Sequence, residues 1–193
     1  MSKSIALLSA AAFAALALTA AVVAPASAQD KMTKSEMSGE KTVMVGGAAM
    51  FRSKNIIQNA VNSKDHTTLV AAVKAAGLVD TLEGKGPFTV FAPTNAAFAK
   101  LAAGTVDTLV KPENKATLTR ILTYHVVPGK LEASDLTDGK TLKTVEGEEL
   151  TVKRSGDTVM IIDSKGGSST VTIPNVNQSN GVIHVVDAVL MPS

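Results

Sequence analysis

The side chains best suited to acid–base or metal chemistry in this sequence are its histidines, His66, His125 and His184. A zinc site needs ligands at short spacing, as in His-x-x-x-His or His-Glu-x-x-His, and none of the histidines lies in such a pattern. The chain also has no cysteine that could supply a thiolate ligand. The sequence therefore predicts neither a metal centre nor a bound cofactor.

Two aspartates in apolar surroundings, Asp163 and Asp187, are candidates for an acid–base pair if the fold brings them together. Alternatively, each carboxylate accepts hydrogen bonds from backbone N–H groups at a strand end. The Gly-x-Ser-x-Gly, phosphate-loop and Gly-x-Gly-x-x-Gly motifs do not occur in the sequence. We therefore expect a protein that is not an enzyme. A catalytic function would need a water-accessible cleft that holds a histidine beside a carboxylate.

Two of the histidines lie in apolar surroundings. His125 follows Tyr124 at the end of a helical stretch, and His184 shares a strand face with Val182 and Val186. A histidine on an apolar face is usually a core residue whose ring nitrogens are both hydrogen-bonded. We expect these rings to be buried and neutral. Their protonation would place an unpaired charge in the core, so the fold should lose stability in acid.

The first half of the chain has mainly helical periodicity. Asp65 and Thr94 are suited to N-caps, Gly77 to a helix stop and Pro112 to a first helical turn. A short strand is expected over residues 88–91. The apolar faces predict helices over residues 56–61, 65–76, 78–82, 94–101, 112–124 and, as one short helix, 131–136.

The second half has a period of two, which is typical of strands. Asn180-Gly181 is the strongest hairpin signal, because a type I′ turn needs positive φ at two successive residues. The nearly unbroken apolar run over residues 182–190 indicates a central strand that is buried on both faces. Helices first and antiparallel strands later predict an α+β fold in one domain.

The N-terminal part resembles an export signal. Residues 1–28 contain Lys3, an apolar core and Ala26-Ser27-Ala28, so a signal peptide cleaved after Ala28 is expected, with an uncleaved anchor as the alternative. Residues 29–54 are polar and aperiodic and predict a flexible linker, with local order near Met50-Phe51 as an open alternative. The domain then covers residues 55–193. The mature protein should be secreted or periplasmic, without a membrane span.

The composition excludes one class of partner. The formal net charge is only +2, and the chain has one tyrosine, five phenylalanines and no tryptophan. Binding of nucleic acid normally uses a basic surface and stacking aromatic side chains. We therefore expect no nucleic-acid partner.

Three stretches together resemble the fasciclin domain family, in the family's order and spacing. The first covers residues 86–98, the second residues 122–129 and the third residues 180–192. The resemblance extends from about residue 55 to residue 192. Apart from the Tyr-His pair, the motif residues with an expected structural role are Pro93, Thr94, Asn95, Phe98, Pro128, Gly129, His184 and Asp187.

The resemblance implies a fasciclin-like β-wedge or sandwich of about seven strands with helices packed along one edge. It also implies a cell-adhesion or extracellular-matrix interaction module that is not catalytic. The candidate interaction motif is Tyr124 and His125 with Leu122, Val126 and Val127. In the alternative interpretation, Tyr124 and His125 lock the helix to the sheet. The expected partner is an unidentified cell-surface or matrix protein or polysaccharide, bound by a monomer.

A different function remains open, which is the periplasmic carriage of a small apolar or metal ligand. A carrier needs an enclosed pocket or converging polar groups. Such a pocket is expected to be lined by residues such as Phe88, Phe91 and Phe98.

Overall fold

A computed structural model describes residues 41–193 of the chain. The predicted signal peptide over residues 1–28 and the first part of the predicted linker lie outside the described residues. Among the described residues, no helix is long and apolar enough to span a bilayer.

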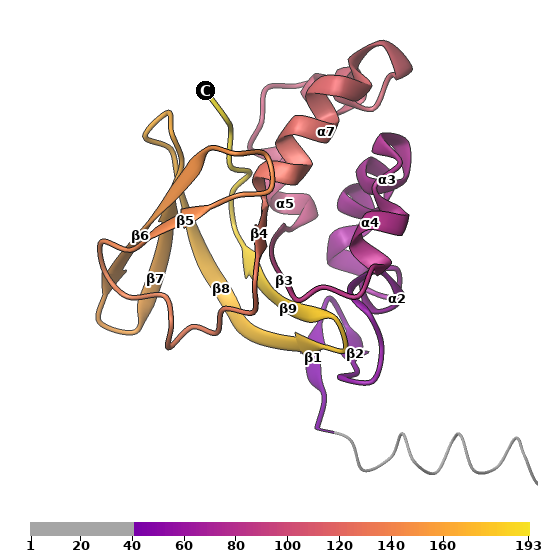
Figure 1. Ribbon diagram of the computed structural model, residues 1–193. Helices are drawn as coiled ribbons and strands as arrows, with labels where there is room; N and C mark the ends of the chain where they lie inside the picture. The colour runs from indigo at the N-terminus through magenta and orange to yellow at the C-terminus, as the bar shows by residue number, and fades with distance from the viewer. Residues whose placement is uncertain (1–40) are drawn as a thin grey trace, which may run out of the picture. The chain divides into compact units, whose positions relative to one another are not determined.

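A mixed sheet of seven strands forms the larger part of the fold (Figure 1). The neighbouring strands β3 and β9 run parallel, and the other neighbours are antiparallel. In spatial order the strands are β4 (Val126–Pro128), β3 (Phe88–Pro93), β9 (Gly181–Val186), β8 (Ser168–Gln178), β7 (Thr158–Ile162), β6 (Glu149–Ser155) and β5 (Thr141–Lys143).

The sheet curls until its two edges meet. The N–H of Val145, just after β5, donates to the carbonyl of Val126 in β4 over 2.8 Å. Figure 1 shows the helices gathered beside β3, β4 and β9, while β5 to β8 fold over on the other side. The α+β class, predicted from the order of the elements, is confirmed, and so is the arrangement of seven strands with helices at one edge that the family resemblance implied.

The helices begin and end largely at the residues that local chemistry favours. Asn55 and Gln58 form a capping box at the first helix, and Gly77 ends another with a φ of 73°. Asp65 is not an N-cap, because it lies within a 3-10 turn. The helices are α2 (Ile56–Ala60), η1 (Lys64–His66), α3 (Thr67–Ala76), α4 (Val79–Glu83), α5 (Asn95–Ala99), α6 (Thr105–Leu109), η2 (Pro112–Asn114) and α7 (Lys115–Tyr124).

The short helix predicted over residues 131–136 is wrong, because that segment consists of turns. The carboxylate of Asp135 accepts from the N–H of Glu132 at 2.9 Å, and this local bond closes a single turn. The N–H of Leu131 donates to the hydroxyl of Thr89, and the side chain of Leu136 is fully buried. Tertiary contacts at both ends hold the segment in a non-helical course.

Strand β9 separates two apolar cores. Ile183 and Val185 point into the core between the sheet and the helices, and Val186 points into the core inside the curled sheet. All six residues of β9 are buried. The prediction of a central strand buried on both faces is confirmed, although the strand ends at Val186 instead of residue 190.

The expected flexible linker over residues 29–54 contains ordered structure at its end. Strands β1 (Val43–Val45) and β2 (Ala48–Met50) form a hairpin, and Val45 and Met50 are buried against the helices and the sheet. The domain therefore begins before residue 55. Gly46 and Gly47 have φ values of 56° and 75°, so the glycines that suggested an interrupted spacer form the turn of this hairpin.

The turn at Asn180-Gly181 also differs from the prediction. A hairpin does join β8 and β9, but its loop residues are Ser179 and Asn180, since Gln178 pairs with Gly181. Neither loop residue has a positive φ, so the turn is not type I′. The side chain of Asn180 instead accepts from the N–H of Ile56 and donates to two carbonyls at the end of α4. The conformation of this turn is therefore determined by long-range hydrogen bonds of the Asn180 side chain.

Candidate functional site

Tyr124, the last residue of α7, is fully buried and joins three parts of the fold. Its hydroxyl donates to the carbonyl of Glu149 in β6 over 3.3 Å and accepts from the N–H of Ser164, after β7, over 2.9 Å. Both partners are far from Tyr124 in the sequence. The hydroxyl therefore fastens the end of the helix to the curled part of the sheet.

His125 caps α7 and has a defined neutral tautomer. Its Nδ1–H donates to the carbonyl of Ile121 over 2.8 Å, and its Nε2 accepts from the N–H of Leu190 over 3.0 Å, because a carbonyl can only accept and an amide can only donate. Burial lowers the pKa of His125 to about 4. The expectation of a buried, neutral and fully bonded histidine is confirmed.

His184 in β9 is bonded in the opposite tautomer. Its Nε2–H donates to the carbonyl of Leu131 over 2.8 Å, and its Nδ1 accepts from the N–H of Asn175 over 3.4 Å. The ring stacks on Phe91, with 5.7 Å between the ring centroids. Burial lowers the pKa of His184. This ring too is a core group, as predicted.

The candidate interaction motif is buried as a whole. Tyr124 and His125 are 0% and 2% exposed, and the aliphatic neighbours Leu122, Val126 and Val127 are also buried. A partner could touch these side chains only after the core had opened. The burial of these side chains favours the alternative, in which Tyr124 and His125 lock α7 to the sheet, over the predicted contact role.

The first box positions α5 against α3. Thr94 accepts from the N–H of Ala97 and caps α5, whose Phe98 enters the core. Asn95 is the link between the helices: its amide oxygen accepts from the N–H of Thr68 over 3.0 Å, and its amide nitrogen donates to the carbonyl of Lys64 over 2.8 Å. Pro93 ends β3 just before this cap. Each of these residues makes its contacts within the fold.

The end of the second box holds β4 beside β3. Pro128 pairs with Phe88 across the two strands, and the N–H of Gly129 donates to the carbonyl of Pro87 over 2.9 Å. The carbonyl of Gly129 accepts from the hydroxyl of Thr89 over 2.7 Å. Pro128 and Gly129 therefore fix the strand that directly follows His125.

The two candidate acid–base aspartates bind mainly backbone N–H groups. Asp163 accepts from the N–H groups of Lys165, Gly167 and Met191. Asp187 accepts from the N–H of Thr170 over 2.7 Å, and its other oxygen pairs with exposed Lys100 over 3.3 Å. This is the structural alternative from the sequence, and neither carboxylate is paired with a histidine.

His66, the third histidine considered for acid–base chemistry, has an unusual environment. The ring is buried, and its Nδ1 lies 2.8 Å from the hydroxyl oxygen of Ser63. Its Nε2 makes no well-formed hydrogen bond among residues 41–193, although the ring interacts with the carbonyl of Ala92. Burial lowers the pKa of His66, although the nearby carbonyl of Ala92 and the charge of Asp65 oppose this shift. An isolated histidine without a motif carries no sequence signal for such a site.

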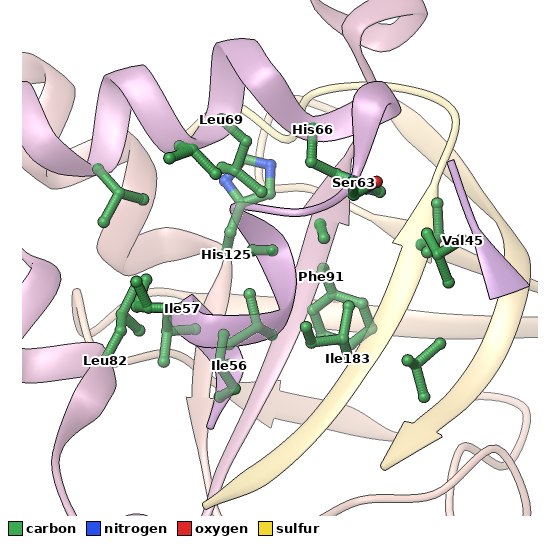
Figure 2. Close-up of a pocket in the computed structure, with 18 of the residues that line it drawn as sticks. Val45, Ile56, Ile57, Ser63, His66, Leu69, Leu82, Phe91, His125 and Ile183 are labelled. Atoms are coloured by element: carbon green, nitrogen blue, oxygen red, sulfur yellow. The ribbon is translucent and has the colours of Figure 1, made fainter. Parts of the chain in front are cut away.

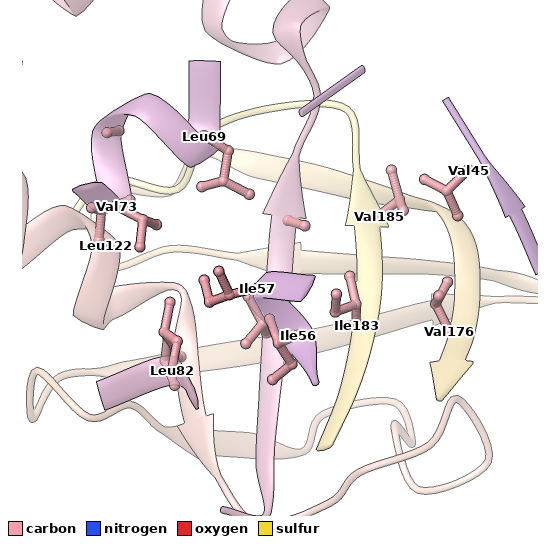
Figure 3. Packing of buried hydrophobic residues seen from close by; sticks show 14 of the residues in the cluster. Val45, Ile56, Ile57, Leu69, Val73, Leu82, Leu122, Val176, Ile183 and Val185 are labelled. Carbon is pink, nitrogen blue, oxygen red and sulfur yellow. The ribbon is translucent and has the colours of Figure 1, made fainter. Parts of the chain in front are cut away.

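An apolar cavity of about 40 Å³ lies between the helices and the sheet (Figure 2). Its walls come from the β1–β2 hairpin, α2, α3, α4, α7 and the central strands, and His66 is among them. Figure 3 shows aliphatic side chains of the helices and of β8 and β9 in the same cluster. Of the phenylalanines expected around a pocket, Phe91 lines this cavity, whereas Phe88 and Phe98 do not.

Metal binding finds no support in the part of the chain that the structure describes. Within residues 41–193, no group of three or more histidine, cysteine, aspartate or glutamate side chains is placed to hold a metal ion.

Comparison with known proteins places this fold and these motifs in a family. The Fasciclin domain family matches residues 64–192. Protein sll1483 of Synechocystis sp. is 48% identical over 79% of this chain and 82% of its own length. The cell surface glycolipoprotein MPB83 of Mycobacterium bovis is 35% identical over 93% of this chain and 79% of its own length. The immunogenic protein MPB70 of the same species is 40% identical over 69% and 66%.

The fold agrees with a solved structure, a FAS1 domain pair from the insect cell adhesion molecule fasciclin I. The TM-score is 0.66 at 17% sequence identity, and the match covers 79% of this chain and 58% of that one. At this identity the likeness concerns the fold alone. Together with the family match and the buried motifs described above, it leads to one conclusion: the chain belongs to the fasciclin domain family.

Proposed function

We propose that the protein is exported and serves as a non-catalytic interaction module, which binds a cell-surface or matrix protein or polysaccharide as a monomer. The observation that carries this proposal is that the candidate catalytic side chains form hydrogen bonds that hold the fold together. His125 and His184 are buried and bonded to the backbone, and Asp163 binds three N–H groups. The family, and a relative named as a cell surface glycolipoprotein, agree with such a role.

The binding surface must be sought outside the buried Tyr-His motif. We propose a contact surface near this motif that consists of the exposed residues Arg120 and Val145 and the half-buried Glu146. Val145 is 45% exposed, and its N–H donates to the carbonyl of Val126 within the motif. Arg120 of α7 reaches Glu146 over 2.7 Å. The motif would then act indirectly, because it positions the helix and the loop that present these side chains.

A binding assay with displayed copies tests this proposal. A single domain should bind weakly, so the mature protein is coupled to beads at high density and incubated with cells, polysaccharides and matrix proteins. Val145→Asp should abolish capture without a change in the unfolding midpoint. The matched control is Val61→Asp, since Val61 is 49% exposed at the end of α2. Equal binding by the two variants would rule out the surface around Val145 as the binding site. If no cell, polysaccharide or matrix protein were captured, the proposed role as an interaction module would be rejected.

Export is a separate part of the proposal. Cell fractionation followed by N-terminal sequencing should find Gln29 as the first residue of the exported form. A protein retained in the membrane fraction with an intact N-terminus would contradict cleavage after Ala28.

Carriage of a small apolar ligand is a second candidate, and the cavity beside His66 is the observation that favours it. The cavity is lined almost entirely by aliphatic side chains, which suits an apolar molecule and not a metal ion.

A further inference from the structure

Asn180 and Gly181 form the Asn-Gly dipeptide of the chain, a sequence in which the asparagine side chain is chemically labile. The glycine has no Cβ to hinder the approach of its backbone nitrogen to the asparagine side chain. That nitrogen gives its proton to hydroxide and attacks the side-chain carbonyl carbon of Asn180, and the new C–N bond closes a succinimide ring. The bond to the side-chain nitrogen breaks, and this nitrogen takes up a proton from water and leaves as ammonia. Water then opens the ring at either carbonyl, which gives aspartate or isoaspartate.

The fold protects this side chain from the reaction. The side-chain oxygen of Asn180 accepts from the N–H of Ile56 over 3.1 Å. The side-chain nitrogen donates to the carbonyls of Leu82 and Gly84 over 2.7 and 2.9 Å, and the reaction would remove this nitrogen from both bonds. Asn180 is 7% exposed and Gly181 is buried in β9, so hydroxide does not reach the attacking nitrogen. The reaction therefore requires this corner of the fold to open first.

The fold needs both residues of the reactive pair. A Cβ on Gly181 would clash with the carbonyl of Phe88 in the neighbouring strand. At position 180 the side chain must accept one hydrogen bond and donate two, which a carboxylate cannot do because it has no hydrogen to donate. Deamidation would bring a negative charge against the carbonyl oxygens of Leu82 and Gly84, and isoaspartate would also lengthen the backbone of the turn. The product therefore cannot rebuild these contacts.

The elements that hold Asn180 are short. The helices α2 and α4 have five residues each, and helices of this length are not stable by themselves. Such elements open locally at a lower cost in free energy than unfolding of the whole domain. We propose that Asn180 is a latent deamidation site, which reacts when α2 and the end of α4 separate from the β8–β9 hairpin and which then prevents their return. The modification is irreversible, so it limits the lifetime of the folded domain.

The first test measures protection by the fold. The full chain is incubated at mildly alkaline pH in native buffer and in concentrated urea, and peptide mapping by mass spectrometry follows aspartate and isoaspartate at position 180. The reaction should be slower in native buffer by on the order of a hundredfold, since three hydrogen bonds must open first. Equal rates in the two solutions would overturn the proposal, and so would an Asn180 that stays intact in urea.

Two matched substitutions distinguish local opening from unfolding of the whole domain. Ile57 of α2 and Ile161 of β7 are both buried, but they lie in different cores. In native buffer, Ile57→Ala should raise the rate of deamidation at least about tenfold, whereas Ile161→Ala should leave the rate unchanged. An equal rise in both variants, or no rise in Ile57→Ala, would overturn the proposal. If Ile57→Ala does not fold, Ile57→Val and Ile161→Val replace the pair, with a smaller expected rise.

The last test concerns the consequence of the modification. The N–H of Ser179 bonds to the carbonyl of Lys54 over 2.9 Å, and the N–H of Ile56 bonds to Asn180, so both report on the same junction. In the purified deamidated chain, these two N–H groups should exchange with deuterium at least about tenfold faster than in the unaltered chain. Unchanged exchange would overturn the proposal. None of these measurements involves a binding partner, so the capture assay for cell-surface binding is decided separately.

Discussion

Acidification should destabilise this protein well before its carboxylates are protonated, because its histidines are buried in the neutral form. His125 shows the effect best. In the unfolded chain its pKa is the ordinary 6.5, and in the folded chain burial lowers it to about 4. Between these values the unfolded state binds more protons than the folded state. The stability is therefore fully present above pH 6.5 and falls steadily as the pH decreases toward 4.

The magnitude follows from the two pKa values. The difference between 6.5 and about 4 corresponds to about 3 kcal/mol once both states are protonated, and to about 2 kcal/mol at pH 5. His66 and His184 act in the same direction, since burial lowers the pKa of each. The loss at pH 5 should therefore exceed the part due to His125 alone. This is a large fraction of the stability of a typical domain.

The assay is denaturant unfolding at about pH 7.5, 6 and 5, together with the NMR titration of each imidazole ring. Glu148 does not interfere: hydrogen bonds from Ser193 and Ser164 lower the pKa of its carboxyl to about 2, so its contribution is lost only below its ordinary 4.5. His125→Gln removes one titrating group and should flatten the dependence on pH. Equal unfolding midpoints at pH 7.5 and 5, or a folded His125 that titrates near 6.5, would refute the reasoning.

Three substitutions test the contacts that hold the fold together, each by denaturant unfolding. Asn180→Ala should cost about 2–4 kcal/mol, because three hydrogen bonds to the α2 and α4 segments, two of them buried, are lost. A cost below about 1 kcal/mol would show that water replaces these bonds. Gly181→Ala should cost about 3 kcal/mol or more, because the new Cβ would clash with the backbone carbonyl of Phe88. The control Gly104→Ala has open space for the new Cβ, so it should cost only about 1–2 kcal/mol for the positive φ of this residue. Tyr124→Phe should cost about 1–3 kcal/mol and leave capture by cells unchanged; loss of capture in a folded Tyr124→Phe protein would restore the contact role of the motif.

The Tyr-His motif shows how family resemblance and physical role can differ. Tyr124 and His125 follow one another in sequence, but each is held by groups far along the chain, the carbonyl of Glu149 for one and the N–H of Leu190 for the other. Tyr124 and His125 therefore attach the end of α7 to the sheet through these hydrogen bonds. The pair's occurrence in a family motif is therefore consistent with a structural requirement, and contact with a partner is not needed to explain it.

The sequence alone was sufficient for features that depend on near neighbours. The cap at Thr94, the helix end at Gly77 and the central strand around Ile183 all follow from residue types within a few positions, and the structure agrees. The chemistry of the buried histidines was also predictable, because an imidazole in an apolar run must have its nitrogens bonded. The fold class followed from the order of helices and strands.

Only the tertiary structure decided which residues are covered and by what. The β1–β2 hairpin is too short to show a steady period, and it is stable because Val45 and Met50 pack on distant segments. The turn at Asn180 is set by bonds to Ile56 and α4. The cavity beside His66 exists because segments that are far apart in the chain do not fill the space between them. Burial and packing are properties of these long-range contacts, and local sequence carries no record of them.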